Sequence, residues 1–357
     1  MTAPAHKTDL LDLLPDELAL LLRGLGQPPY RARQLLAWLH RGASLAEMTD
    51  LSKALRDRLA ALAVPGTLTV AEQLTAPDGA SRLALRAADG QLVETVIIPH
   101  PARTTVCVSS QVGCAFACRF CATGKQGLVR SLSAGEIVHQ VVLAQRATLP
   151  RRVSNVVFMG MGEPLANYDA VVRAARLLHH PDGLNVSARH IAISTCGLPD
   201  QIRRLAAEGL PLALAISLHA PTDDLRSQLV PVNRTHPIPD LIAAAREYAH
   251  RTGRKVAFQY VVLPGVNDSP DQARRLADLL RGLPAMVNLI PQNPIEGFAR
   301  PDAHAAAAFA RLLDRRGVPV AVRSSRGGEV LGACGQLRSR LSGHSKAGRA
   351  SARPAPE

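Results

Sequence analysis

From about residue 103 onward the chain alternates short apolar runs with amphipathic stretches, and this alternation restricts its possible folds more than any other feature. The amphipathic stretches, such as Ser133–Ala147 and Pro270–Arg281, have the periodicity of helices. The apolar runs predict strands at Thr104–Ser109, Val153–Met159, His190–Thr195, Leu212–Leu218, Lys255–Leu263, Met286–Ile290 and Val318–Arg323. Strands that alternate with helices form parallel sheets. Six or seven such units predict an α/β fold, a partial or complete (β/α) barrel, whose chemistry lies at the C-terminal ends of the strands.

The N-terminal part of the chain has two other patterns. Residues 8–62 look helical, and Tyr30–His40 places its apolar side chains on one face. Three segments between residues 67 and 99 alternate like strands, with turn signals at Asp78-Gly79 and Asp89-Gly90. The expected parts are an N-terminal helical accessory domain at 1–62, a β-hairpin extension at 63–102, the barrel with a C-terminal catalytic loop at 103–342 and a disordered tail of low complexity at 343–357.

The charge of the chain favours a polyanionic partner. Lysine and arginine total 42 against 29 aspartate and glutamate, which gives a net charge of +13 at pH 7. RNA or DNA is the first partner that such a surplus indicates, and a generally basic composition is the alternative. Aromatic residues are only 3% of the chain, which argues against extensive base stacking on aromatic platforms. The helix with Arg31, Arg33 and Arg41 is the candidate for part of an RNA footprint.

Nothing in the sequence predicts a membrane segment. Apolar runs such as Val256–Pro264 are too short to span a bilayer. The start of the chain, Met1–Leu14, contains Asp9 and Asp12 and does not resemble a secretory signal. We therefore expect a cytoplasmic protein.

Four of the six cysteines lie within fifteen residues, a grouping typical of metal binding rather than of a disulfide framework. Cys114, Cys118 and Cys121 have a Cys-x3-Cys-x2-Cys spacing, closely after the first predicted barrel strand. Three thiolates on one loop can hold three corners of a 4Fe–4S cluster and leave the fourth iron open. The amino and carboxylate groups of S-adenosylmethionine suit that open position, so the expected cofactors are one 4Fe–4S cluster and S-adenosylmethionine. Zinc is the alternative, but it usually takes four protein ligands in paired groups.

Polar and glycine residues stand at the ends of the following predicted strands. In Val157–Leu165, Gly160 and Gly162 let the backbone approach a ligand, and Glu163 is placed to accept hydrogen bonds from an ammonium group or ribose hydroxyls. We expect the S-adenosylmethionine site to include Gly162, Glu163, Ser194, Ser217, Leu218, His219 and Asn293. Taken singly, each of these residues is equally compatible with an ordinary turn or cap.

Three further residues are candidates for chemistry. Cys334 lies among glycines in Arg326–Leu337, which predicts a mobile loop rather than a packed core. Glu94 ends an alternating strand, and a surface charge is its alternative reading. Cys107 can equally be a core thiol, and we interpret Cys196 as structural.

With these residues placed, the chain resembles the dual-specificity RNA adenine-carbon-2 methyltransferases, from about residue 20 to 342. The resemblance lies in Tyr30-Arg-Ala-Arg-Gln34, Val93-Glu-Thr95, Cys107-Val-Ser-Ser-Gln-Val-Gly-Cys114, Gly160-Met-Gly-Glu-Pro-Leu165, Ser217-Leu-His-Ala-Pro221, Pro231-Val-Asn233 and Ala333-Cys-Gly-Gln336. It implies a radical S-adenosylmethionine barrel with Cys114, Cys118 and Cys121 as the cluster ligands. Glu329-Val-Leu-Gly332 and Gln292 depart from the family pattern and concern substrate fit.

The resemblance also implies a two-thiol mechanism. Cys334 is the cysteine that becomes methylated by one S-adenosylmethionine, and a second one gives the radical that activates that methyl group. Glu94 then accepts the ring proton, and Cys107 releases the product by forming a disulfide with Cys334. The implied substrates are 23S rRNA in the peptidyl transferase region and tRNA beside the anticodon. The implied protein is a monomer that receives electrons from a donor such as flavodoxin or ferredoxin.

Three alternatives stay open from the sequence. The related carbon-8 methyltransferases, which confer antibiotic resistance, share the cysteines, although Pro164 and Ala220 resemble the carbon-2 enzymes. A non-catalytic iron–sulfur or zinc protein that binds RNA has no use for Cys334. Sulfur insertion normally needs a second cluster, for which too few cysteines remain.

Overall fold

The computed structural model describes residues 7–291, 293, 303–323 and 326–338. The expected tail at 343–357 and Gln292 lie outside these residues.

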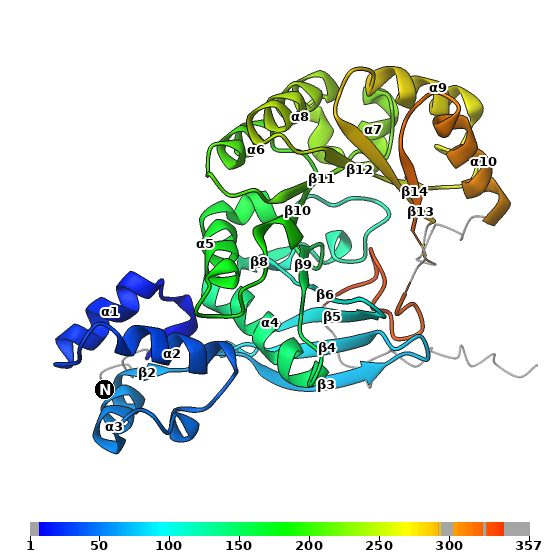
Figure 1. Ribbon diagram of the computed structural model, residues 1–357. Helices are drawn as coiled ribbons and strands as arrows, with labels where there is room; N and C mark the ends of the chain where they lie inside the picture. The colour runs from blue at the N-terminus through cyan, green and yellow to red at the C-terminus, as the bar shows by residue number, and fades with distance from the viewer. Residues whose placement is uncertain (1–6, 292, 294–302, 324–325, 339–357) are drawn as a thin grey trace, which may run out of the picture.

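One ten-stranded sheet organises the chain (Figure 1). Its parallel strands are β6 (Arg103–Cys107), β9 (Asn155–Phe158), β10 (Ile191–Thr195), β11 (Ala213–Ser217), β12 (Val256–Val262), β13 (Ala285–Pro291) and β14 (Val320–Val322). All the predicted barrel strands are therefore confirmed. The strand order runs from β14 at one edge to β3 at the other, so the sheet is an open, partial barrel rather than a complete one.

The hairpin strands belong to this same sheet. They are β3 (Thr69–Thr75), β4 (Ser81–Arg86) and β5 (Leu92–His100), and β5 pairs antiparallel with β6. Both predicted turns contain a glycine with a φ of 82°, Gly79 and Gly90, which suits a residue without a Cβ. The hairpins thus extend the barrel wall, and Glu94 on β5 enters the same sheet as Cys107 on β6.

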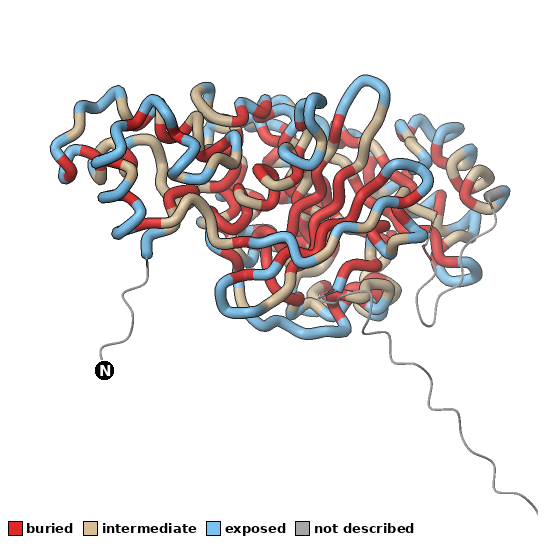
Figure 2. The backbone as a smooth tube through the Cα atoms, turned by 90° about the horizontal axis from the view of Figure 1, so that it is seen from below, coloured by how far each residue is buried: buried red, intermediate tan, exposed pale blue. Residues whose placement is uncertain are grey.

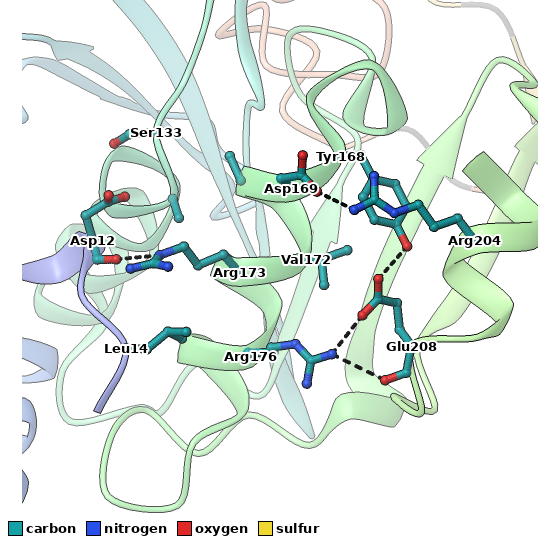
Figure 3. A pocket seen from close by; sticks show the side chains of 12 residues that line it. Asp12, Leu14, Ser133, Tyr168, Asp169, Val172, Arg173, Arg176, Arg204 and Glu208 are labelled. Atoms are coloured by element: carbon teal, nitrogen blue, oxygen red, sulfur yellow. Dashed lines mark hydrogen bonds and ion pairs between the residues drawn. The ribbon is translucent and has the colours of Figure 1, made fainter. Parts of the chain in front are cut away.

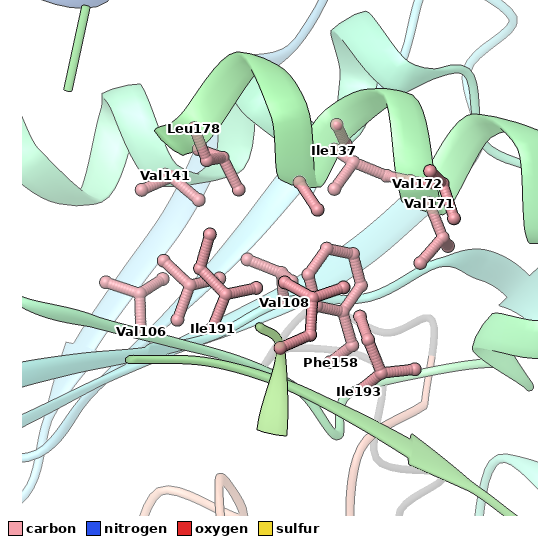
Figure 4. Close-up of a cluster of buried hydrophobic side chains, with 14 of the residues drawn as sticks. Val106, Val108, Ile137, Val141, Phe158, Val171, Val172, Leu178, Ile191 and Ile193 are labelled. Atoms are coloured by element: carbon pink, nitrogen blue, oxygen red, sulfur yellow. The ribbon is translucent and has the colours of Figure 1, made fainter. Parts of the chain in front are cut away.

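Helices cover the outer face of the curved sheet (Figure 1). They are α4 (Ala134–Thr148), α5 (Tyr168–His179), α6 (Pro199–Ala206), α8 (Ile238–Thr252), α9 (Pro270–Leu279) and α10 (Ala303–Asp314). The short helix α7 (Asp223–Leu229) instead contacts the C-terminal ends of β10 and β11. Alternate residues of the strands, among them Val106, Phe158 and Ile193, meet Ile137 of α4 and Val171 of α5 (Figure 4). Burial of each such side chain contributes about 1.5–3 kcal/mol, so this layer fixes the strand ends in place.

An N-terminal group of helices packs beside the barrel (Figure 1). It consists of α1 (Pro15–Gly24), α2 (Arg31–His40) and α3 (Lys53–Leu62), with the short strands β1 (Thr8–Asp9) and β2 (Ala63–Val64) paired in parallel. The helical pattern predicted for residues 8–62 is confirmed. Figure 2 shows the buried strands in the centre of the molecule and the exposed segments around them. Among the described residues, no helix has both the length and the apolar character needed to cross a membrane.

One buried and one half-buried histidine, His40 and His139, join the N-terminal part to the barrel. His40 of α2 accepts a hydrogen bond at Nδ1 from the Leu184 amide, at 3.0 Å. His139 of α4 accepts one at Nδ1 from the Leu68 amide, also at 3.0 Å. Burial lowers the pKa of each imidazole to about 4, so both are neutral at physiological pH. Neutral rings are required because a protonated Nδ1 cannot accept these hydrogen bonds.

Acidification should therefore destabilise the fold before most carboxylates titrate. Each histidine binds a proton near pH 6.5 when unfolded and near pH 4 when folded, so stability falls as the pH drops below about 6.5. Between pH 7.5 and 5 we expect a loss of about 2 kcal/mol per histidine in the free energy of unfolding. Urea titrations at the two pH values measure this loss. His139→Asn, which keeps an acceptor, should remove about half of it, whereas the exposed His250→Asn should not change it.

Candidate functional site

The three clustered cysteines lie on a loop that connects the two strands of a small sheet. This sheet was not predicted from the sequence. Strands β7 (Gln111–Gly113) and β8 (Leu128–Ser131) pair antiparallel, and the loop connects them. The Cys114 amide donates to the Gly127 carbonyl at 2.9 Å, and the Cys121 amide donates to the Cys118 carbonyl at 3.1 Å. The short sheet thus closes the base of the loop and gives the cysteines a fixed frame.

Gly113 makes this closure possible. Its φ is 78°, and a Cβ at this position would lie 1.8 Å from the Gly127 carbonyl oxygen. The backbone of the neighbouring strand therefore fills the space that any other side chain needs. This glycine directly precedes Cys114, so the position of the first cysteine depends on it.

The cysteine side chains suit an iron–sulfur cluster. Burial, together with the charges of Cys118, Glu163 and Cys121, raises the pKa of Cys114 to about 12, so these groups are neighbours. Thiolates so placed require a cationic group to be stable, and soft thiolate ligands favour iron–sulfur clusters. In the part of the chain that is described, no three His, Cys, Asp or Glu side chains converge as ligands of a single metal ion. A cluster does not need such convergence, because each thiolate binds a different iron.

Cys196 lies closer to this loop than its interpretation as a structural residue suggested. Its Sγ is 3.7 Å from Sγ of Cys118. The hydrogen bond with Cys118, followed by burial, raises the pKa of Cys196 well above its usual value. The sequence offered one signal for this contact, since Cys196 directly follows β10 and so stands at the C-terminal edge of the sheet.

Glu163 connects two strand ends. It is 2% exposed, and its carboxylate accepts hydrogen bonds from the amides of Leu165 at 3.0 Å and Cys196 at 2.7 Å. Burial raises the pKa of this carboxyl group, whereas the backbone hydrogen bonds oppose the rise. A Cβ on Gly162 would lie 2.5 Å from Cβ of Gln111, and one on Gly160 would lie 2.7 Å from the Val108 carbonyl oxygen. The chain itself therefore occupies the space that a side chain would need at both glycines. The expected approach of a ligand to their backbone stays a prediction.

His219 turns the chain sharply after β11. Its φ of 61° is left-handed, and its Nδ1 accepts a hydrogen bond from the Val261 amide at 3.0 Å. The ring meets Phe120 of the cysteine loop edge-on, with 4.6 Å between ring centroids. Burial, aided by Arg226, lowers the pKa of His219 to about 3, so the imidazole is neutral and its Nε2 carries the proton. Ser194 and Ser217 are half-buried on the neighbouring strands β10 and β11, and Leu218 is fully buried.

The C-terminal segment 326–338 packs against the cysteine loop (Figure 1). The Ala122 amide donates to the Gly335 carbonyl at 2.8 Å, and the Thr123 hydroxyl donates to the Leu337 carbonyl. At its other end, the Gly327 amide donates to Oδ2 of Asp78 at 2.9 Å. Asn293 donates to the Cys334 carbonyl at 3.1 Å. The segment is a loop, as expected, and hydrogen bonds hold both of its ends. Its mobility stays a prediction.

Cys107 and Cys334 are neighbours in the structure. Cys107 ends β6 and packs against Val96, Met161 and Leu337, and the charge of Cys334 adds to burial in raising the pKa of Cys107. Cys334 is exposed, whereas Cys107 is buried. All six cysteines are free thiols, so the Cys107–Cys334 disulfide expected from the resemblance is absent and stays a prediction.

Glu94 is a buried ionic residue rather than a surface charge. It is 0% exposed and forms an ion pair with Arg82, which also pairs with Glu72 at 2.9 Å. The Arg338 amide donates to Oε2 of Glu94 at 2.9 Å. Glu94 thus lies against the same C-terminal segment that contains Cys334.

A separate hollow lies between α5, α6 and the N-terminal residues (Figure 3). The three arginines that line it form ion pairs: Arg173 with Glu17, Arg176 with Glu208 and Arg204 with Asp169. None of the candidate site residues lines this hollow. Because acidic partners neutralise these arginines, the hollow has no surplus charge to bind an anion.

Comparisons with known proteins agree with this geometry. Residues 108–277 match the radical SAM superfamily, and residues 8–64 match the N-terminal domain of ribosomal RNA large subunit methyltransferases. A dual-specificity RNA methyltransferase RlmN from Anaeromyxobacter dehalogenans is 49% identical over 92% of this chain and 91% of its own length. A probable RlmN from Symbiobacterium thermophilum is 47% identical over 91% of this chain and 90% of its own. The crystal structure of a radical SAM methyltransferase from Sphaerobacter thermophilus is 49% identical, with a TM-score of 0.91 over 93% of this chain and 100% of that one.

The open parallel sheet and the cysteine loop define a radical S-adenosylmethionine enzyme, whose cofactors are a 4Fe–4S cluster and S-adenosylmethionine. Within that superfamily, the chain belongs to the family of dual-specificity RNA methyltransferases known as RlmN. It is therefore a methyltransferase that acts on RNA.

Gly113→Ala should prevent cluster assembly, because its Cβ would collide with the Gly127 carbonyl. We expect iron content after anaerobic reconstitution to fall to a small fraction of the wild-type value. Gly265→Ala is the matched control, since Gly265 also has a positive φ of 69° but no atom within 4 Å of an added Cβ. Equal iron in both variants would contradict the dependence on this closure.

The proximity of Cys196 to Cys118 allows a test of which thiols hold iron. Replacement of Cys114, Cys118 or Cys121 by Ala should remove the 4Fe–4S absorption and the acid-labile sulfide. Cys196→Ser should retain both, because three thiolates suffice for a cluster with one open iron. If the cluster survives Cys118→Ala but not Cys196→Ser, then Cys196 rather than Cys118 is the iron ligand.

Proposed function

We propose that this chain methylates carbon 2 of an adenine in 23S rRNA, in the peptidyl transferase region, and of an adenine in tRNA beside the anticodon. The observation that carries the proposal is the meeting of Cys107, Cys334 and Glu94 at one C-terminal segment, which hydrogen bonds join to the cysteine loop. The relatives' printed name, dual-specificity RNA methyltransferase, supports two kinds of RNA substrate.

The residues proposed to bind the cofactors lie on loops or at strand ends of the barrel. Cys114, Cys118 and Cys121 would hold the cluster, and Gly162, Glu163, Ser194, Ser217, Leu218, His219 and Asn293 would contact S-adenosylmethionine. When bound, these cofactors supply the radical chemistry that activates a methyl group on Cys334. The neutral His219 offers an N–H donor, and the half-buried hydroxyls of Ser194 and Ser217 are accessible to polar ligand groups.

Three side chains of the protein carry out the remaining steps. Cys334, the exposed thiol, accepts the methyl group from S-adenosylmethionine as a thiolate. Glu94 accepts the proton from the adenine carbon, and Arg82 keeps its carboxylate ionised before that step. The Cys107 thiolate finally attacks the Cys334 sulfur, so that an S–S bond forms and the bond from the Cys334 sulfur to the bridging methylene carbon breaks. The electron pair of the broken bond takes up a proton from water, and the carbon stays on RNA as a methyl group.

The N-terminal helices are the proposed RNA-binding accessory region. Arg33 of α2 pairs with Asp182 at 3.1 Å and yet remains 75% exposed, so its guanidinium can still meet a phosphate. Arg31 donates to the Asp50 carbonyl at 2.7 Å, and Arg41 lies over the Trp38 ring at 5.4 Å. We further propose a monomeric, cytoplasmic enzyme that receives electrons from a flavodoxin or ferredoxin.

The product in RNA tests the proposal directly. RNA from a strain that lacks its own enzyme but expresses this chain should contain 2-methyladenosine, measured by mass spectrometry of digested nucleosides. Cys334→Ala should abolish it and keep the cluster, because the substitution removes the methyl carrier and no ligand. Cys107→Ala should leave protein bound to RNA through a thioether, seen as a shifted band on a denaturing gel.

The same measurement separates the carbon-8 alternative. If 8-methyladenosine is the main product, with resistance to antibiotics of the peptidyl transferase centre, the carbon-2 assignment is wrong. Normal turnover by either cysteine variant would contradict the two-thiol mechanism.

A further inference from the structure

Arg226 of α7 is a fully buried cation with neutral partners. Its side chain is 0% exposed. It donates to the carbonyls of Leu218 at 3.2 Å, Ser217 at 3.1 Å and Cys196, and to Oδ1 of Asn233 at 2.6 Å. None of these four acceptors carries a charge. Burial of a cation without a directly bound anion is costly, so this arrangement calls for a negative charge nearby.

The carboxylate of Asp223 acts on Arg226 without a hydrogen bond to it. Asp223 accepts from Nδ2 of Asn233 at 2.9 Å and from the Ile238 amide at 2.8 Å. Asn233 thus bonds both Asp223 and Arg226. The hydrogen bonds fix the position of the guanidinium without neutralising it.

The cysteine loop contacts the C-terminal end of α7, the helix that contains Arg226. The Arg119 amide donates to the Leu229 carbonyl at 3.1 Å, three residues after Arg226. Cys118 packs in one apolar cluster with Leu229 and Val230. Burial lowers the pKa of Arg226, whereas negative charge on Cys196, Cys118 and Asp223 opposes this lowering. The guanidinium is therefore within electrostatic range of Cys118, a proposed cluster ligand.

Arg226 also joins several proposed site residues. Cys196 contacts Arg226 and two of these residues. Its carbonyl accepts from Arg226, its amide donates to Glu163, and its thiol lies beside the Cys118 thiol. The Ser217 and Leu218 carbonyls are held by the same guanidinium. The ends of β10 and β11 therefore form one unit around a single positive charge.

We propose that Arg226 is a positioning residue that compensates the negative charge of the thiolate-bound cluster and thereby favours its one-electron reduction. The inference rests on the proposed cluster ligands. Reduction adds one negative charge to an already anionic group, and in a low-dielectric interior a fixed cation nearby stabilises the reduced form. The net charge around an iron–sulfur cluster is one of the factors that set its reduction potential.

Two substitutions separate charge from hydrogen bonding. Arg226→Gln removes the charge and keeps an amide donor, whereas Arg226→Lys keeps the charge and loses the planar fork. The reconstituted full-length variants are compared by iron content and by reductive titration, with the EPR signal of the reduced cluster as the readout. Arg226→Gln should make reduction at least tenfold less favourable, a shift of ~59 mV to more negative potential for one electron. Arg226→Lys should stay close to wild type.

Arg234→Gln is the matched control, since it removes an exposed arginine from the segment that follows α7 and should leave the potential unchanged. An unchanged potential in Arg226→Gln at full iron content overturns the proposal, and so does an equal shift in the Lys and Gln variants. If Arg226→Gln loses its iron, retention by Arg226→Lys supports the charge role and equal loss overturns it. If the Gln variant does not fold, the reduction potential of Arg226→Lys decides: a value close to wild type supports the proposal, and a shift of about 59 mV or more to negative potential overturns it. A wild-type chain without iron would instead contradict the proposed function.

Discussion

The contact between the cysteine loop and the C-terminal segment brings the rest of the site together. The Ala122 amide and the Thr123 hydroxyl donate to carbonyls of Gly335 and Leu337, which lie more than 200 residues further along the chain. Through this contact Cys334 comes to lie beside Cys107 and near the cysteine loop. A methyl carrier must reach both the radical source and the substrate ring, and errors of about 1 Å can cost about 100-fold in rate. The segment that contains Cys334 therefore has to be held in place.

Charge is buried on two sides of this contact. Arg82 pairs with Glu94 of the hairpin, and Arg226 bonds the Cys196 carbonyl at the end of β10. The two arginines differ in their surroundings, because Arg82 meets carboxylates whereas Arg226 meets only neutral oxygens. The first is a cation whose charge two carboxylates balance. The second leaves positive charge available to an anionic group at the strand ends.

The fold supports the site through its sheet. Because β5 pairs with β6, the hairpins are part of the barrel wall, and Glu94 lies on the strand next to the one that Cys107 ends. An open sheet leaves the C-terminal segment free to pack across the strand ends, which a closed barrel would restrict. His40 bonds the Leu184 amide and His139 the Leu68 amide, so that the N-terminal helices and the site belong to one structure.

The sequence by itself determined the strand and helix order, the parallel barrel sheet and the cysteine spacing, because periodicity and motif spacing are local properties of the chain. It also indicated Cys334, Cys107 and Glu94, which stand in recognisable motifs. Only the tertiary structure decided that the barrel is open, that the glycines at 160 and 162 face the chain itself, and that the Cys334 segment is anchored. The same holds for Cys196 beside Cys118 and for the buried Arg226. These features depend on contacts between segments distant in sequence, which leave no periodic signal.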